Sequence, residues 1–168
     1  MDHPNPYAPP KAAVADAVEV SSGTELASRG QRLGASLLDT LVALIWSIPL
    51  GLGFGIWTAV FRHEPVPPGK IALVALLSAL LFMLVNGKLL HTHGQTLGKR
   101  WVGIRIVTLD NELPDFWRLV ALRYGPIWLL PHIPFIGRVA SLIDDLFIFG
   151  PSRRCLHDLI AGTKVVRA

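Results

Sequence analysis

Residues 33–61 of the chain read LGASLLDTLVALIWSIPLGLGFGIWTAVF, and Asp39 is the single charged residue in this stretch. A helix of about 20 apolar residues is long enough to cross the hydrocarbon core of a bilayer. A second stretch, residues 71–90, has the same character and contains Lys88 as its single charge. The two stretches predict two long transmembrane helices.

The composition supports the same interpretation. Of the 168 residues, 51% are hydrophobic and 17% are charged, and the mean hydropathy is +0.46. A water-soluble domain carries charge on about a quarter of its residues, so the sequence predicts an integral membrane protein. The net charge of +4 is explained by membrane topology, and we therefore expect no nucleic-acid partner.

Basic residues gather around three parts of the chain. They precede the first apolar stretch, follow the second, and recur near the end of the sequence, for example at Arg29, Arg105 and Arg153. Positive residues concentrate on the cytoplasmic side of membrane proteins. We therefore place the N-terminus, the central loop and the C-terminus in the cytoplasm, so that the first helix runs outward and the second returns.

The apolar stretch 116–149 must then enter and leave the membrane on the same side. It is broken at Pro131-His132-Ile133-Pro134, and each half is short for a full crossing. The stretch predicts a helical hairpin. It forms either two thin crossings, giving four in all, or a re-entrant pair beside two crossings.

Two short segments have the pattern of strands. Residues 103–110 and 162–167 are rich in β-branched residues, and each begins at a glycine. Together they predict a small cytosolic β-ribbon that leans on the helices. The expected fold is therefore an all-α membrane protein: a small bundle of two long transmembrane helices and a Pro-broken hairpin, with this short ribbon. Residues 1–28 are expected to form a disordered cytosolic tail, and residues 29–168 the membrane domain.

A carboxylate among lipid tails is costly and usually marks a functional site or a protein interior. Asp39 follows Arg32 by seven positions, which is about 10.5 Å along a helix. The two residues share a helix face but lie too far apart for an easy direct contact. The partner of Asp39 is therefore expected on another helix.

Asp144 is one candidate partner, because it lies at a similar expected depth. The string Ala35–Asp39 also nearly recurs as Ala140–Asp144, as in transporters built from inverted repeats. Arg32, Asp39 and Asp144 are thus predicted to form a polar cluster. That cluster either binds a proton or an ion, or fixes helix packing. Asp145 is expected to be either a second-rank partner or an interfacial acid.

The remaining motifs are weaker. His157-Asp158 predicts either a proton relay or a structural turn in which Asp158 caps a helix. Lys99 and Arg100 are expected to bind anionic lipid headgroups. The pair His91 and His93 lacks the further ligands of a zinc site, so no metal is expected.

Three segments together resemble the RDD family of bacterial membrane proteins. They are the Arg32-to-Asp39 spacing, residues 94–100 (GQTLGKR) and residues 153–163 (RRCLHDLIAGT). The resemblance implies a bacterial inner-membrane location and a suspected role in transport. Arg32 and Asp39 match the arginine and one aspartate that give the family its name. The second aspartate is Asp144, Asp145 or Asp158.

The sequence contains no catalytic triad, no hydrolase serine motif and no cofactor fingerprint, so we expect neither an enzyme nor a cofactor. The leading hypothesis is a small transporter or exchanger of protons or monovalent cations that uses Asp39. The alternative is a non-enzymatic membrane scaffold or accessory subunit in which the Arg/Asp cluster is structural. The expected partners are the lipid bilayer and anionic lipids, and the sequence also allows a homo-oligomer.

Overall fold

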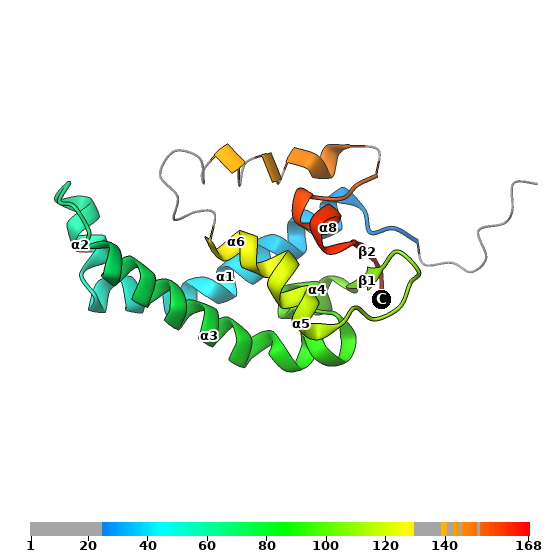
Figure 1. The fold of residues 1–168 in the computed structure, drawn as a ribbon, viewed down its shortest axis with the longest axis horizontal. Coiled ribbons are helices and arrows are strands. Elements are labelled where there is room, and N and C mark those ends of the chain that lie inside the picture. Colours follow the sequence, from blue (N-terminus) through cyan, green and yellow to red (C-terminus); the bar gives the residue numbers. More distant parts are fainter. Residues whose placement is uncertain (1–24, 130–138, 141–142, 145, 151) are drawn as a thin grey trace, which may run out of the picture.

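Two long helices dominate the fold (Figure 1). The computed structural model describes residues 25–129, 139–140, 143–144, 146–150 and 152–168. In it, α1 (Arg29–Gly53) and α3 (Pro68–His93) pack along each other and are joined through the short α2 (Ile56–Phe61). The first apolar stretch is therefore not one continuous helix. Gly55 has a φ of 72°, a left-handed conformation that suits glycine, and it turns the chain between α1 and α2.

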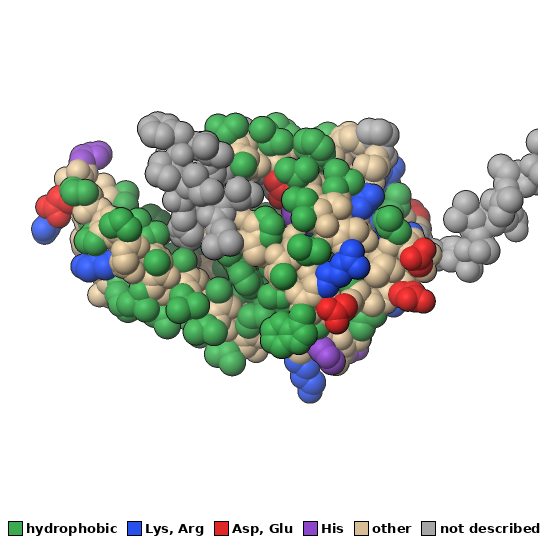
Figure 2. Space-filling view, viewed as in Figure 1, with side chains coloured by type: hydrophobic (Ala, Val, Ile, Leu, Met, Phe, Trp, Pro, Cys, Tyr) green, Lys and Arg blue, Asp and Glu red, His purple; other side chains and the backbone are tan. Residues whose placement is uncertain are grey.

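Both long helices are apolar on the outside. The most apolar 18-residue window of α1 is 6% buried within the chain, and that of α3 is 0% buried. A core helix of a water-soluble protein would instead be covered by other parts of the chain. Figure 2 shows hydrophobic side chains spread over the visible face of α3. Among the described residues, α1 and α3 are the helices with the length and composition to cross a membrane.

The start of α1 is firmly fixed. Ser28 caps the helix by accepting from the backbone N–H of Gln31, and the Gln31 side chain accepts from the Ser28 N–H in return. Just before the cap, Leu26 pairs with Val166, and Ala27 N donates to the Val165 carbonyl. Residues 25–28, which the sequence places in the tail, thus lie against the C-terminal strand. Residues 1–24 of that predicted tail lie outside the described residues.

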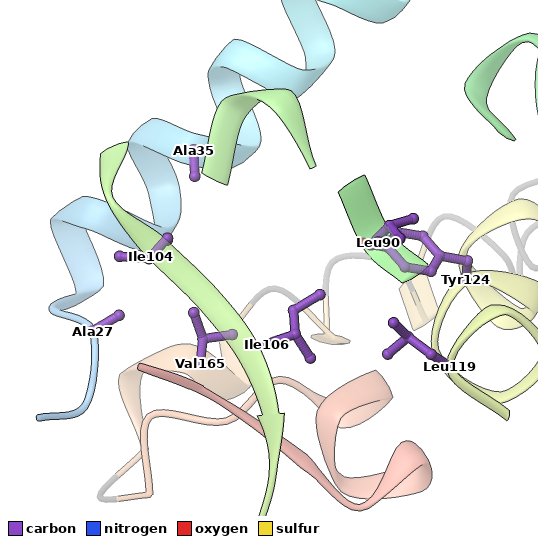
Figure 3. Packing of buried hydrophobic residues seen from close by; sticks show 8 residues of the cluster. All are labelled: Ala27, Ala35, Leu90, Ile104, Ile106, Leu119, Tyr124 and Val165. Atoms are coloured by element: carbon purple, nitrogen blue, oxygen red, sulfur yellow. The ribbon is translucent and has the colours of Figure 1, made fainter. Parts of the chain in front are cut away.

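The predicted ribbon is confirmed. Strand β1 (Ile104–Thr108) pairs antiparallel with β2 (Thr163–Arg167), and Ile106 lies opposite Val165. Helix α4 (Leu97–Val102) leads directly into β1. An isolated two-stranded ribbon is marginal in water, and here it joins the core. Figure 3 shows this core between the ribbon, α1, α3 and α5, formed by Ala27, Ala35, Leu90, Ile104, Ile106, Leu119, Tyr124 and Val165.

The remaining described residues include several short helical segments. Residues 116–129 form α5 (Phe116–Leu119), the π-helical η1 (Val120–Tyr124) and α6 (Gly125–Leu129), followed later by η3 (Phe147–Phe149) and α8 (Leu156–Ala161). The predicted break at Pro131–Pro134 lies outside the described residues. The choice between four crossings and two crossings with a re-entrant hairpin stays a prediction.

Candidate functional site

Asp158 is the centre of a buried ion-pair cluster. Its side chain is completely buried, in the first turn of α8. Arg32 of α1 donates to Asp158 Oδ2, and Arg123 of η1 pairs with Oδ1. Arg32 and Arg123 are themselves 8% and 3% exposed. One carboxylate therefore holds together α1, η1 and α8, three elements that are far apart in the sequence.

Further hydrogen bonds complete the solvation of this carboxylate. Cys155 N donates to Asp158 Oδ2 over 3.1 Å, which closes a capping box at the start of α8. Thr163 Oγ1 lies 3.4 Å from Oδ1 and accepts from Arg123 over 2.9 Å. A buried ion pair is stable when hydrogen bonds satisfy its remaining polar atoms. The cluster thus has the features of a structural lock, in agreement with the capping alternative for Asp158.

Arg123 is the member of this cluster that the sequence alone does not identify. In the sequence it is one of the positive residues that follow the second apolar stretch. Arg123 is a charged residue within the apolar stretch 116–149. A charge within an apolar stretch is also the feature that identified Asp39. Arg123 lies in the π-helical segment η1, and such segments are frequent at functional sites. The wider turn of η1 buries both Arg123 and Tyr124.

Asp39 has a different set of partners. Its Oδ1 accepts from Gly98 N over 2.8 Å, and its Oδ2 accepts from Thr96 Oγ1 over 2.5 Å. Lys99 Nζ lies 3.4 Å from the same Oδ2. Asp39 thus binds the N-terminal end of α4, where backbone N–H groups and the helix dipole favour a negative charge.

The N-terminus of α4 is almost fully satisfied by side chains. Besides Asp39 at Gly98, Asn86 of α3 accepts from Leu97 N over 2.9 Å, and Thr96 caps the helix at Lys99 N. Asn86 is only 2% exposed. Two long helices therefore present polar side chains to one short helix, and this fixes α4 between them.

Asp144 pairs with the histidine of the C-terminal motif. His157 N donates to Asp144 Oδ1 over 2.8 Å, and the His157 ring Nδ1 lies 2.6 Å from Oδ2. The other ring nitrogen, Nε2, lies 3.8 Å from Asp158 Oδ1. His157 thus hydrogen-bonds to Asp144 and stands near Asp158, but its Nε2 lies beyond hydrogen-bond distance of Oδ1.

The three residues predicted to form one cluster, Arg32, Asp39 and Asp144, thus each contact a different partner. Arg32 pairs with Asp158 in place of either predicted aspartate. Asp39 contacts α4, and Asp144 contacts His157. Within-helix spacing could not identify these partners, because all of them come from elsewhere in the chain.

The two residues predicted to bind lipid headgroups, Lys99 and Arg100, differ in their exposure. Lys99 is 15% exposed and faces Asp39, whereas its neighbour Arg100 is exposed. Of the two residues expected to bind lipid headgroups, Arg100 is thus the accessible one. Asp145 lies outside the described residues, as does part of the repeated string Ala140–Asp144.

The three predicted residues nevertheless share one feature. A cavity of about 500 Å³ lies between α1, α4, η1, α6 and α8, and Arg32, Asp39 and Asp144 all line it. Small-molecule sites commonly have volumes of about 300–1,000 Å³. Its polar wall also includes Thr96, Lys99, Arg123, Cys155 and His157, and its apolar wall includes Phe82, Tyr124, Ile127, Trp128 and Ile148.

A metal site is not favoured by this arrangement. Ligand atoms of Cys155, His157 and Asp158 lie within 4.8 Å of one another. However, both oxygens of Asp158 face guanidinium groups. A divalent cation would add further positive charge beside two arginines, which is unfavourable at low dielectric constant.

The stability of the protein is expected to fall as the pH is lowered from 7 to 5. Burial, together with the positive charges of Arg123 and Arg32, lowers the pKa of His157 from 6.5 to about 4, although Asp144 acts in the opposite direction. Between these values the unfolded chain binds a proton that the folded chain does not. Stability is therefore full above pH 6.5 and is lost toward pH 4, by about 1.4 kcal/mol per pH unit.

This pH dependence can be measured by thermal unfolding in detergent at pH 7, 6 and 5. The His157→Gln variant lacks the titrating ring and is expected to show a flatter profile over this range. The matched control is His91→Gln, since His91 is exposed at the end of α3. An unchanged slope in the His157→Gln variant would contradict the assignment.

Comparison with known proteins identifies relatives of this chain. The sequence model described as "RDD family" matches residues 26–162. The chain is 37% identical over 138 residues to "Uncharacterized protein YckC" of Bacillus subtilis (strain 168), covering 82% of each chain. It is 30% identical over 146 residues to an "Uncharacterized protein" of Haemophilus influenzae, covering 84% of this chain and 78% of the relative. No solved structure matches the chain.

Proposed function

Because this chain belongs to the RDD family, we propose that it is a multi-pass protein of the bacterial inner membrane that moves protons or monovalent cations. The observation that supports this role is the cavity beside α1, whose wall carries Asp39 and the Asp144–His157 pair. Carboxylates and histidines at such positions are the usual elements of ion and proton pathways.

Asp39 is the proposed ion site. It is 18% exposed toward the cavity, and the Lys99 ammonium group lies 3.4 Å from its Oδ2. This contact is long for a charge-assisted hydrogen bond. An incoming cation or proton can therefore take the place of the ammonium group while Gly98 N and Thr96 Oγ1 keep the carboxylate in position. Asp144 and His157 supply a second site at which a proton can be exchanged.

The proposed orientation places the ribbon in the cytoplasm. The end of the molecule that carries the ribbon also carries the exposed side chains of Arg100, Trp101 and Trp117. Tryptophan and basic residues are enriched where a membrane protein meets the headgroup layer. Arg100 is the proposed contact with anionic lipid on this side.

Flux measurements in proteoliposomes test the proposed function. The purified protein is expected to dissipate an imposed pH gradient when sodium or potassium ions are supplied. Asp39→Asn is expected to reduce this flux at least tenfold, because asparagine can still accept from Gly98 N but cannot bind a cation through charge. The matched control, Asp110→Asn, changes an exposed aspartate and is expected to leave the flux unchanged. Full flux from the Asp39→Asn protein would refute the role of Asp39.

The pairing of Arg32 and Arg123 with Asp158 favours a second candidate, a non-enzymatic scaffold or accessory subunit. In this role the ion pairs only maintain the fold, and the ribbon binds another protein. A wild-type protein without flux, together with a partner that is lost when residues 103–110 are replaced, would favour this candidate over transport.

A further inference from the structure

The hydroxyl group of Tyr124 is buried without a hydrogen bond of full geometry among the described residues. The residue is 7% exposed, and its Oη forms no hydrogen bond of acceptable geometry in that part of the chain. Arg123 interacts with Tyr124 electrostatically and through a side-chain hydrogen-bonding contact, but no contact of the hydroxyl group in that part of the chain has full hydrogen-bond geometry. Leaving a buried hydroxyl unsatisfied costs about 1–3 kcal/mol. Since Tyr124 lines the cavity, a ligand in the cavity can satisfy this group.

An aromatic wall surrounds the Tyr124 ring. Its centroid lies 5.2 Å from that of Phe82 and 5.9 Å from that of Trp128, and Phe82 meets Trp128 edge-on at 5.5 Å. All three rings line the same cavity, together with Ile127. Such a wall binds an apolar ring or chain by burial and by edge-to-face contact.

The charges around the cavity balance. Among the described lining residues, three are permanent cations (Arg32, Lys99 and Arg123) and two are carboxylates (Asp39 and Asp144). The third carboxylate, Asp158, is bonded to both arginines, which gives three positive and three negative charges in all. A resident ligand that carried a net charge and left the Asp39–Lys99 pair in place would lack a compensating partner, and burying such a charge is strongly unfavourable.

We infer that the apolar part of this cavity binds a small uncharged amphipathic solute, with an aromatic or aliphatic body and one N–H or O–H group that hydrogen-bonds to Tyr124 Oη. The volume of about 500 Å³ exceeds that of a bicyclic ring system. The inference rests on the proposed transport function, because it names the class of solute that shares the cavity with the moving proton or cation.

Three probes of matched shape and different charge test the inference. They are indole, which is neutral, indole-3-acetate, which is an anion, and tryptamine, which is a cation. Binding to the full-length protein in nanodiscs is measured by isothermal titration calorimetry, with empty nanodiscs as the reference. Indole is expected to bind saturably and at least tenfold more tightly than either charged analogue.

Variants locate the binding site. Tyr124→Phe removes only the hydroxyl group and is expected to weaken indole binding about fivefold, which corresponds to one neutral hydrogen bond. Trp128→Ala is expected to weaken it at least tenfold. The matched control, Trp101→Phe, alters a ring that is 62% exposed and is expected to leave binding unchanged.

Three results would overturn the inference: no saturable indole binding, charged analogues that bind as tightly as indole, or unchanged indole binding in Tyr124→Phe. The first would mean that water satisfies the hydroxyl group. If Tyr124→Phe does not fold, the comparison of indole with its two charged analogues on the wild-type protein still tests the inference. Binding at equilibrium requires no transport. Indole binding without ion flux would therefore refute the proposed function alone, and ion flux without indole binding would refute this inference alone.

Discussion

Replacement of Asp158 by alanine is expected to lower the free energy of unfolding by about 3–5 kcal/mol. The substitution leaves the guanidinium groups of Arg32 and Arg123 buried without a negative partner. It also removes the capping contact with Cys155 N at the start of α8. The elements α1, η1 and α8 would lose the carboxylate that they share.

Thermal and denaturant unfolding in detergent micelles measure this effect. Asp110→Ala is the matched control, because Asp110 is exposed and its loss is expected to change stability by less than about 0.5 kcal/mol. A triple variant, Asp158→Leu with Arg32→Met and Arg123→Met, replaces the whole cluster with apolar side chains. It is expected to recover most of the lost stability, because no unpaired charge remains. An Asp158→Ala protein as stable as the wild type would refute the structural role.

Substitution of Gly98 by alanine is expected to destabilise the protein by about 3 kcal/mol, near the upper end of the range for overpacking. A Cβ atom at this position would overlap the carbonyl oxygen of Ala35 and lie 2.9 Å from both Cγ and the backbone N of Asp39. Two of these are backbone atoms of α1, so they cannot rotate away as a flexible side chain can. Helix α4 would have to move off α1, and Asp39 would lose its hydrogen bond from Gly98 N.

The matched control for this substitution is Gly87→Ala. Gly87 lies inside α3, and a Cβ atom there meets nothing within 4 Å. Alanine is expected to stabilise this helix by about 0.5–1 kcal/mol. The two substitutions thus add the same methyl group with opposite expected effects. A Gly98→Ala protein with wild-type stability and wild-type flux would contradict the close packing of α4 on α1.

The buried cluster also bears on which aspartate is the second one of the family, a choice that the sequence leaves open. Asp144, Asp145 and Asp158 were all candidates for the second aspartate of the family. Of the described ones, Asp158 pairs with Arg32, and Asp144 pairs with His157. Arg32 and Asp158 thus form one unit in this chain, whereas Asp39 forms another with α4.

The sequence by itself determined the local structure. The apolar stretches at residues 33–61 and 71–90 predicted the long helices, because burial of an unbroken apolar run does not depend on which partners it meets. The two β-branched segments predicted the ribbon for a similar reason, since alternation and glycine placement act within a few residues. One local difference is the continuity of residues 33–61, where the left-handed Gly55 lets the chain turn.

Only the tertiary structure decided which charges meet. Arg32 and Asp158 are separated by 126 positions in the chain, and Asp39 and Gly98 by 59. No pattern within one helix encodes such a pairing. The π-helical turn that directs Arg123 to Asp158, and the close approach of α4 to α1 at Gly98, arise from packing between segments. The physical reason is that a buried charge takes whichever partners and hydrogen bonds the folded chain brings within reach, and these exist only after the helices have packed.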